Sequence, residues 1–264
     1  MGQNYGVAKG VPLLTFTACR MAGGTCSHSD IEDGLEAVTL AMQSKKRRGV
    51  VILAISFTYL DSFYKTWWDT RLESLTQAGG ILVTSSGNQQ RDACRIQPAF
   101  SEYAITVGAL EAVETMSALS GSALMEYHAA LYSNYGKCVD VWGPGTNIVS
   151  ACAGSDVCYE KRTGTSMAVP WVAGVVATYL MQNNDLTLLE IRSKLRSKRG
   201  SVNVHGKCPG AKPGKSGIKC RRPLFECVDQ CCVASGTSSS SSSRCADHLR
   251  KKSCKGISEC IWRC

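Results

Sequence analysis

The chain has 264 residues, is 44% apolar and carries a formal net charge of +9, which suits one globular α/β domain of about 200 residues with a small appendage. The longest strongly apolar stretch, residues 167–181, is shorter than the roughly 20 residues that a membrane-spanning helix needs, so no membrane span is expected. Residues 205–264 hold twelve Lys and Arg against four Asp and Glu, but they show no zinc-finger or RNA-binding pattern, so nucleic-acid binding is not expected.

Two apolar runs of strand length, residues 11–17 and 49–57, frame a stretch with helical periodicity. Apolar side chains recur at helical spacing across residues 31–42, which predicts a helix there. Ser29 with Glu32 is a capping-box pair, in which the side chains satisfy free N–H groups of the first turn, and it predicts where this helix begins. The first part of the chain is therefore expected to be a strand–helix–strand unit.

The same alternation continues downstream. Leu72 and Leu75 indicate a second helix that ends at Gly79-Gly80, followed by strands at Ile81–Thr84 and Ala104–Ala109. Alternating helices and strands favour a mostly parallel sheet that is flanked by helices on both faces. The expected fold class is therefore α/β.

Another strand and two helices complete the expected domain. The strand is expected at Val139–Trp142, and an apolar helical run follows Ser166. Thr187 with Glu190 is a second capping-box pair, which introduces a final helix that reaches about Lys198. The compact domain is expected to end near this residue.

The composition shifts from Gly200 onward to Gly, Lys, Pro and Cys. We therefore expect a domain at residues 1–200 and a cysteine-rich basic tail at residues 201–264, with a serine-rich linker at residues 235–243. The tail has too few apolar residues to build a core without crosslinks. It is expected to form small disulfide-stapled knots, whose connectivity the sequence does not define.

The chain has fifteen cysteines, which indicates an oxidising compartment and hence an extracellular protein. Residues 1–10 nevertheless lack the charged and apolar regions of a signal peptide. Because the count is odd, at least one cysteine lacks a partner within the chain. Either it is a free buried thiol, or a segment upstream is missing.

The stretch Thr163–Gly174 reads TGTSMAVPWVAG. It resembles the nucleophile segment of subtilases, Gly-Thr-Ser-Met-Ala-x-Pro-x-Val-Ala-Gly, and matches every defined position, with Trp171 where many members have His. The resemblance implies a subtilisin-like serine peptidase with Ser166 as its nucleophile, at the start of a buried helix whose N-terminus favours a developing oxyanion. The alternative is that Ser166 only caps a core helix.

A second match follows the strand Ile81–Thr84. Ser85-Ser86-Gly87-Asn88 resembles the small-small-Gly-Asn segment of the family. The resemblance implies that Asn88 donates a hydrogen bond to the oxyanion, and that Ser85, Ser86 and Gly87 contribute to substrate binding. The alternative is an ordinary turn asparagine after glycine.

Further matches extend the resemblance along the chain. They lie at residues 5–8, 97–109 and 132–145. With the two motifs they cover about residues 5–198, and they are closest to the proteinase K branch of the family. The resemblance therefore implies a partial subtilisin-like fold.

The family orders its catalytic triad as Asp, His and Ser, and the first two precede the Tyr-Gly-Val-Ala segment with which this chain begins. No Asp-x-Gly and no His-Gly-Thr-His sequence occurs in the chain. We therefore expect the chain to be N-terminally incomplete and Ser166 to be a weak nucleophile, because no base accompanies it. His28 is expected to be an exposed loop residue at the outer substrate cleft. The other three histidines are expected on the surface or in the tail, and they are His128, His205 and His248.

A second departure from the family concerns substrate binding. The family's edge strand Ser-Leu-Gly-Gly aligns with residues 56–59, so Ser56, Phe57 and Thr58 are expected to bind substrate. Both glycines are replaced, and Thr58 and Tyr59 are expected to narrow the primary pocket. The alternative is that Phe57 is an ordinary core aromatic residue.

Two functions stay open at this point. The first is a secreted serine endopeptidase that acts on polypeptide substrates. The second is a non-catalytic pseudo-peptidase or binding module that acts through its cysteine-rich tail on a polysaccharide or a cell surface. No cofactor is expected; structural calcium is frequent in the family, but the sequence has no dense carboxylate loop that would name metal ligands.

Overall fold

The computed structural model describes residues 6–19, 26–45, 48–58, 61–116, 123–152, 155 and 157–197, with four short strands further on. Most of the predicted tail, including the linker at residues 235–243, lies outside the described residues. The division into a domain and a tail therefore stays a prediction.

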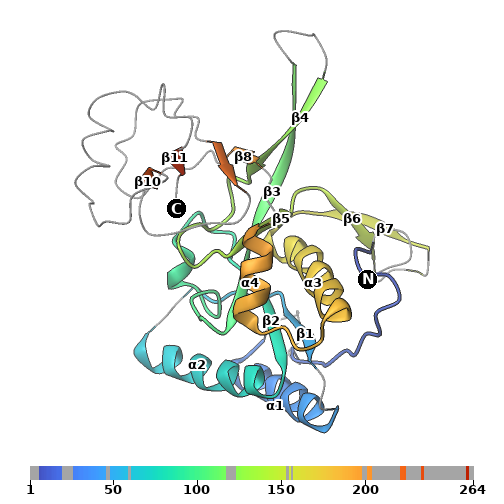
Figure 1. Ribbon diagram of the computed structural model, residues 1–264, viewed down its shortest axis with the longest axis vertical. Coiled ribbons are helices and arrows are strands. Elements are labelled where there is room, and N and C mark those ends of the chain that lie inside the picture. Colours follow the sequence, from blue (N-terminus) through green and yellow to red (C-terminus); the bar gives the residue numbers. More distant parts are fainter. Residues whose placement is uncertain are drawn as a thin grey trace.

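A mostly parallel sheet forms the centre of the molecule (Figure 1). Its strands are β1 (Gly49–Leu53), β2 (Gly80–Ser85), β3 (Ala104–Met116), β4 (Ala123–Ala129), β5 (Val141–Pro144), β8 (Ser201–Asn203) and β9 (Arg221–Pro223). β1 pairs with β2, β2 with β3 and β3 with β5, all in parallel. β4 pairs antiparallel with the far half of β3, and β8 and β9 follow it in the sheet. Two short strands, β10 (Val233–Ala234) and β11 (Cys260–Ile261), pair separately.

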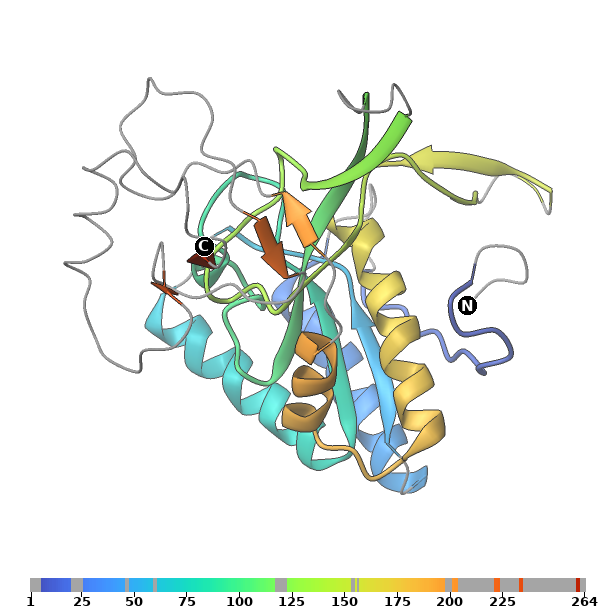
Figure 2. The same ribbon diagram turned by 45° about the horizontal axis from the view of Figure 1, so that its top comes forward.

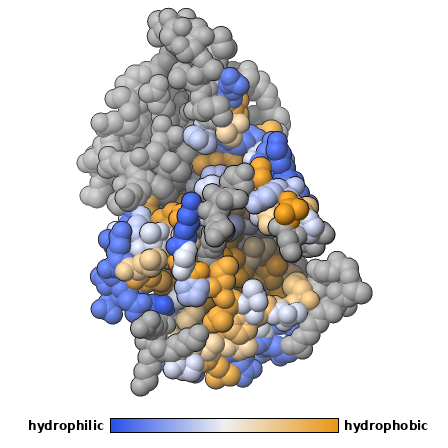
Figure 3. All heavy atoms as spheres, turned by 90° about the vertical axis from the view of Figure 1, so that its right-hand side faces the viewer, coloured by the Kyte–Doolittle hydropathy of each residue, from blue (hydrophilic) through white to orange (hydrophobic). Residues whose placement is uncertain are grey.

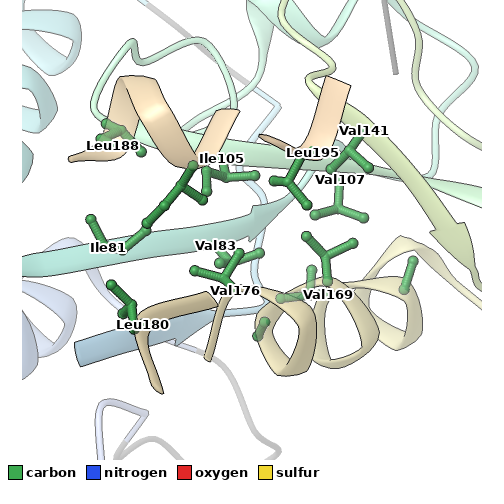
Figure 4. Close-up of a cluster of buried hydrophobic side chains, with 14 of the residues drawn as sticks. Ile81, Val83, Ile105, Val107, Val141, Val169, Val176, Leu180, Leu188 and Leu195 are labelled. Atoms are coloured by element: carbon green, nitrogen blue, oxygen red, sulfur yellow. The ribbon is translucent and has the colours of Figure 1, made fainter. Parts of the chain in front are cut away.

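Helices cover both faces of this sheet (Figure 2). The helices α1 (His28–Lys45) and α2 (Ser62–Gln77) pack on one face, and α3 (Thr165–Gln182) and α4 (Leu188–Ser197) pack on the other. Successive side chains of a strand point to opposite faces. Ile81 and Val83 of β2 therefore join the core under α3 and α4 (Figure 4), whereas Leu82 joins the core under α1 and α2. The predicted α/β fold is confirmed.

The helix α1 begins earlier than its predicted capping box. Ser27 is the cap, because its Oγ accepts from the Asp30 N–H at 3.1 Å and the Asp30 carboxylate accepts from the Ser27 N–H at 3.1 Å. Glu32 cannot serve the first turn, because its carboxylate forms an ion pair with Arg71 of α2. The prediction that Ser29 and Glu32 begin the helix is therefore wrong by two residues.

The other helix boundaries follow the sequence signals. The Glu190 carboxylate accepts from both the N–H and the Oγ–H of Thr187 at 2.7 Å, which confirms the second capping box. The helix α2 ends at Gln77, and Gly79 beyond it has a φ of +96°, a conformation that glycine adopts without strain. In the part of the chain that the structure describes, no helix is long and apolar enough to cross a membrane.

Residues 11–17 have no regular secondary structure and do not form the strand that their composition predicts. No strand among the described residues pairs with them. Leu13 and Leu14 are 60% and 64% exposed, and Phe16 is also exposed. Figure 3 views the side of the molecule on which this segment and α3 lie, and hydrophobic residues gather on that side. An apolar run becomes a strand only where a neighbouring strand accepts its hydrogen bonds, and the described residues supply none here.

The sequence predicted none of the antiparallel pairings among the described strands. Besides β8 with β9 and β10 with β11, they are β4 on β3 and a separate hairpin of β6 (Ile148–Ala151) and β7 (Tyr159–Arg162). A disulfide between Cys152 and Cys158 closes this hairpin, and two further disulfides join Cys19 to Cys26 and Cys94 to Cys138. The predicted strands at 49–57 and 139–142 also shift, because β1 ends at Leu53 and β5 begins at Val141.

Candidate functional site

Ser166 is the second residue of α3, at the end of the helix that faces the carboxyl ends of the parallel strands. It is half-buried, and its Oγ donates a hydrogen bond to the carbonyl of Ala54 at 2.9 Å. Ala54 is the residue that follows β1. The predicted nucleophile therefore lies at the start of a buried helix, as the motif implies, with its hydroxyl proton held by the main chain.

Asn88 lies beside Ser166, in the loop that follows β2. Its Oδ1 accepts two hydrogen bonds from Thr165, one from the backbone N–H at 2.8 Å and one from Oγ1 at 2.9 Å. Thr165 Oγ1 in turn accepts from the N–H of Gly87 at 3.2 Å. Both acceptor positions of the Asn88 oxygen are thus used, so this carboxamide has only its Nδ2 donors left for a ligand.

The first turn of α3 also leaves a backbone donor unused. The Thr165 N–H goes to Asn88, and the Met167 N–H goes to the carbonyl of Gly164 at 3.0 Å. The described residues offer no such acceptor to the N–H of Ser166 between them. An unused N–H at a helix N-terminus attracts negative charge. The Ser166 N–H and Asn88 Nδ2 are thus two donors in this region without an acceptor among the described residues, and the predicted oxyanion role of Asn88 stays a prediction.

The predicted substrate-binding residues Ser85, Ser86 and Gly87 connect β2 to Asn88. The Ser85 hydroxyl donates to the carbonyl of Ile55 at 3.2 Å, and the Ser86 hydroxyl donates to that of Asn134 at 3.4 Å. Both serine side chains are buried and tie the loop to its neighbours. Any contact that they make with a substrate would therefore use their main chain, and their substrate-binding role stays a prediction.

The segment after β1 carries the other predicted substrate-binding residues. Phe57 pairs with Gln97 in both directions, at 2.9 and 3.0 Å between backbone N and O atoms. Because backbone groups alternate along an extended chain, those of Ser56 and Thr58 point to the opposite edge. The backbone of Phe57 is thus fixed to the protein, and the substrate-binding role of Ser56, Phe57 and Thr58 stays a prediction. Tyr59 lies outside the described residues.

His28 is not the exposed loop residue that the sequence predicts. It is the first residue of α1, half-buried, and its ring stacks on Phe57 and Tyr64 at centroid distances of 4.6 and 4.3 Å. Its Nε2 lies 3.1 Å from Gln97 Oε1, which also accepts from Trp68 Nε1 at 2.8 Å. Because a tryptophan N–H only donates, that Gln97 atom is the oxygen, so His28 Nε2 is the donor. The prediction of an exposed loop residue is therefore wrong, because the ring is half-buried against aromatic neighbours at the start of a helix.

Two further expectations concern the remaining histidines and a metal. His128 is buried in β4 at 6% exposure, so the expectation of a surface position is wrong; its register opposite Glu111 and Asn203 puts it inside the sheet. His205 and His248 lie outside the described residues. Within the described ranges, no three His, Cys, Asp or Glu side chains come together as metal ligands would. Structural calcium therefore stays a prediction.

A buried ion pair fixes the sheet below the site. Asp140, which precedes β5, accepts from the Thr106 N–H of β3 at 2.9 Å and pairs with Arg192 of α4 at 3.2 Å. Burial raises the pKa of this carboxyl, while Arg192 opposes that shift. The pair holds α4 against the strands that end at the site, which is a structural task.

Three groups at the site were not singled out from the sequence. Thr165 anchors the oxygen of Asn88, the Ala54 carbonyl accepts a hydrogen bond from Ser166 Oγ–H, and Gln97 joins the Phe57 segment to His28. Thr165 is part of the matched motif, so the motif could have suggested it. A main-chain carbonyl such as that of Ala54 has no sequence signal, because every residue carries one.

Comparisons with known proteins agree with this arrangement. The profile of the Subtilase family, Peptidase S8, matches residues 2–212. A subtilisin-like serine protease of Rhodotorula mucilaginosa, Rho m 2.0101, is 35% identical over 181 residues, which are 68% of this chain and 49% of that protein. Proprotein convertase subtilisin/kexin type 9 of Rattus norvegicus is 34% identical over 74% of this chain and 26% of its own length. The crystal structure of a cold-adapted subtilisin-like serine proteinase superposes with a TM-score of 0.54 and 30% identity, over 67% of this chain and 56% of that one. This chain thus spans half or less of the length of these two sequence relatives.

Proposed function

The chain belongs to the subtilase family, and on this premise we propose that it is the part of a subtilisin-type serine endopeptidase that carries the nucleophile Ser166 and the oxyanion donor Asn88. The observation that carries the proposal is the double anchor of Asn88 Oδ1 on Thr165, at 2.8 and 2.9 Å. It leaves the Nδ2 donors available, on a side chain that is bonded to the residue just before Ser166. The three disulfides favour an oxidising and hence extracellular location.

In this function, Ser166 Oγ adds to the carbonyl carbon of a peptide bond, and negative charge develops on the carbonyl oxygen. The Ser166 N–H and Asn88 Nδ2 donate to that oxygen, which is the step at which preorganised donors act most strongly. In subtilisin itself, loss of the side-chain donor lowers the rate by about 10²–10³. The proposed substrate is a polypeptide that lies along the outer edge of Ser56 and Thr58.

The nucleophile needs a base that takes its proton. Ser166 Oγ–H donates instead to the carbonyl of Ala54, a group that cannot accept a proton at neutral pH, and His28 donates to Gln97. We therefore propose that the residues of this chain bind and stabilise the tetrahedral state but do not turn over substrate by themselves.

A peptidyl boronic acid tests this function without a catalytic base. The Ser166 oxygen bonds to boron, the boronic acid becomes a tetrahedral anion with both of its hydroxyls retained, and the serine proton passes to solvent. We expect the folded 264-residue chain to give the tetrahedral signal in boron NMR, and Ser166→Ala to give none. A trigonal signal with both proteins would contradict the proposal.

A second function, a non-catalytic relative that binds through its cysteine-rich tail, is favoured by the same Ser166 to Ala54 hydrogen bond. A serine hydroxyl that donates to a main-chain carbonyl joins two parts of the fold, and this structural role needs no substrate. Contact with a polysaccharide or a cell surface would then belong to the basic tail. The boronic acid separates the two functions, because a purely structural Ser166 does not bond to boron.

A further inference from the structure

We propose that Asn134, in the loop between β4 and β5, is a positioning residue that sets the carboxamide of Asn88 for the oxyanion. The inference rests on the proposed function and adds to it a group that never touches substrate. Asn134 is fully buried. It acts through the loop of residues 86–91, which carries Asn88.

The side chain of Asn134 uses its whole hydrogen-bonding capacity on that loop. Its Oδ1 accepts from the N–H groups of Gln89 and Arg91, both at 2.9 Å. Its Nδ2 donates to the carbonyl of Ser86 at 2.7 Å and to Gln89 Oε1 at 3.0 Å. A carboxamide has two acceptor positions and two N–H donors, so all four are satisfied.

The contacts fall on both sides of Asn88. Ser86 lies two residues before it and Gln89 one residue after it, and the Asn134 N–H also donates to the carbonyl of Gly87 at 2.9 Å. Gly87 has a φ of +99°, and a Cβ there would lie 2.3 Å from Asn134 Nδ2. The loop therefore packs tightly around the Asn134 carboxamide. Asn88 lies between the residues whose main chain or side chain Asn134 holds by hydrogen bonds.

The side chain of Asn88 is held in addition by Thr165. The clamped main chain aims its side chain at Thr165, which binds Oδ1 and fixes which end of the carboxamide meets the substrate. An aspartate at position 134 would keep the shape and lose both donors, and it would bring a carboxylate oxygen against the carbonyl of Ser86. The loop would then shift by a fraction of an ångström at Asn88, while all the side-chain bonds that are lost lie within residues 86–91.

The test measures the affinity of the full chain for a peptidyl boronic acid and for the same peptide ending in an amide, which forms no adduct. We expect Asn134→Asp to weaken boronate binding at least tenfold and to leave amide binding unchanged. Asn88→Ala should have the same effect, and the double variant should be no weaker than Asn88→Ala alone, because both act on one donor. Asn183→Asp, at the exposed C-cap of α3, is the matched control and should change neither affinity.

A second variant covers the case in which Asn134→Asp does not fold. Gln89→Met removes only the contact of Asn134 Nδ2 with an exposed side chain, and we expect a several-fold loss in boronate affinity alone. The inference is overturned if Asn88→Ala weakens boronate binding while the variants at 134 and 89 do not, or if they weaken both ligands equally. If Asn88→Ala has no effect, the proposed function itself fails and the positioning role falls with it.

Discussion

At the scale of single residues, the hydroxyl of Ser166 is the group on which the two proposed functions differ most. It joins the start of α3 to the end of β1 through Ala54, so it contributes to stability whatever else it does. A partly buried hydrogen bond of this kind contributes about 0.5–1.5 kcal/mol.

We therefore expect Ser166→Ala to lower the free energy of unfolding by about 1 kcal/mol, as measured by urea denaturation. Ser193→Ala, on the exposed face of α4, is the matched control and should stay within about 0.5 kcal/mol of the parent. A Ser166→Ala variant as stable as the parent would mean that the bond to Ala54 is not kept in solution.

The same residue decides catalysis. The Ala54 carbonyl cannot take the Ser166 proton, and the His28 ring is held by Gln97 and by aromatic neighbours, with no contact to Ser166 among the described residues. The 264-residue chain should therefore hydrolyse a peptide ester no faster than its Ser166→Ala variant. The measurement is initial rates at equal concentrations of folded protein. Turnover of about 1 s⁻¹ that depends on Ser166 would be ordinary enzyme activity and would refute this. If His28→Ala then abolished it, the stacked histidine would be the base.

At the scale of the elements, helix boundaries and parallel strands could be predicted wherever a local signal decides them. The pair Thr187 and Glu190 begins α4 as its spacing indicates, and Gly79 ends α2. The capping-box signal was misleading where a distant residue competes for the same side chain. Glu32 forms an ion pair with Arg71 of α2 and therefore does not cap α1. The strand prediction for residues 11–17 failed for a related reason. A strand needs a second segment to pair with, and the composition of residues 11–17 describes only one of the two.

The cap of α4 makes stability depend on pH. The N–H and Oγ–H of Thr187 donate to the Glu190 carboxylate and hold the pKa of that group below its ordinary value. The stabilisation is therefore present above the unfolded pKa of Glu190 and is lost as the pH falls through the lower folded value. Thr187→Ala removes the Oγ–H donor but keeps the backbone N–H, which is the larger cause of the lowered pKa. It should therefore cost about 1 kcal/mol at neutral pH and only partly reduce the pH dependence of the unfolding midpoint. Thr178→Ala, on α3 and exposed, should leave the slope unchanged.

At the scale of the whole molecule, the candidate site forms where four separate segments meet. Ser166 and Asn88 could be placed from their motifs, because both motifs are local in sequence. The hydrogen bonds of Asn134 to the loop of Asn88 and the stacking of His28 on Phe57 could not be predicted. They join residues more than about twenty positions apart and have no periodic signal. The antiparallel return of β4 along β3 was missed for the same reason, and it is what brings Asn134 back to the loop of Asn88.

Crosslinks between distant segments should therefore matter more for global stability than those within one hairpin. The Cys94–Cys138 bridge joins residues 44 apart and closes the region that contains β3, β4 and Asn134, whereas Cys152–Cys158 joins residues six apart. In the chain-entropy account, the longer closed loop restricts the unfolded chain more, by roughly 1.5–2 kcal/mol for this pair of loops.

We expect replacement of Cys94 and Cys138 by alanine to lower the free energy of unfolding by about 2–5 kcal/mol, and the matched replacement of Cys152 and Cys158 to cost less by that difference. Urea denaturation of both double variants measures this. The first variant should also weaken boronate binding, because Cys94 and Cys138 flank the two loops that meet at Asn134. Equal losses of stability in the two variants would show that native contacts around the bridges, and not the restriction of the unfolded chain, set their contribution.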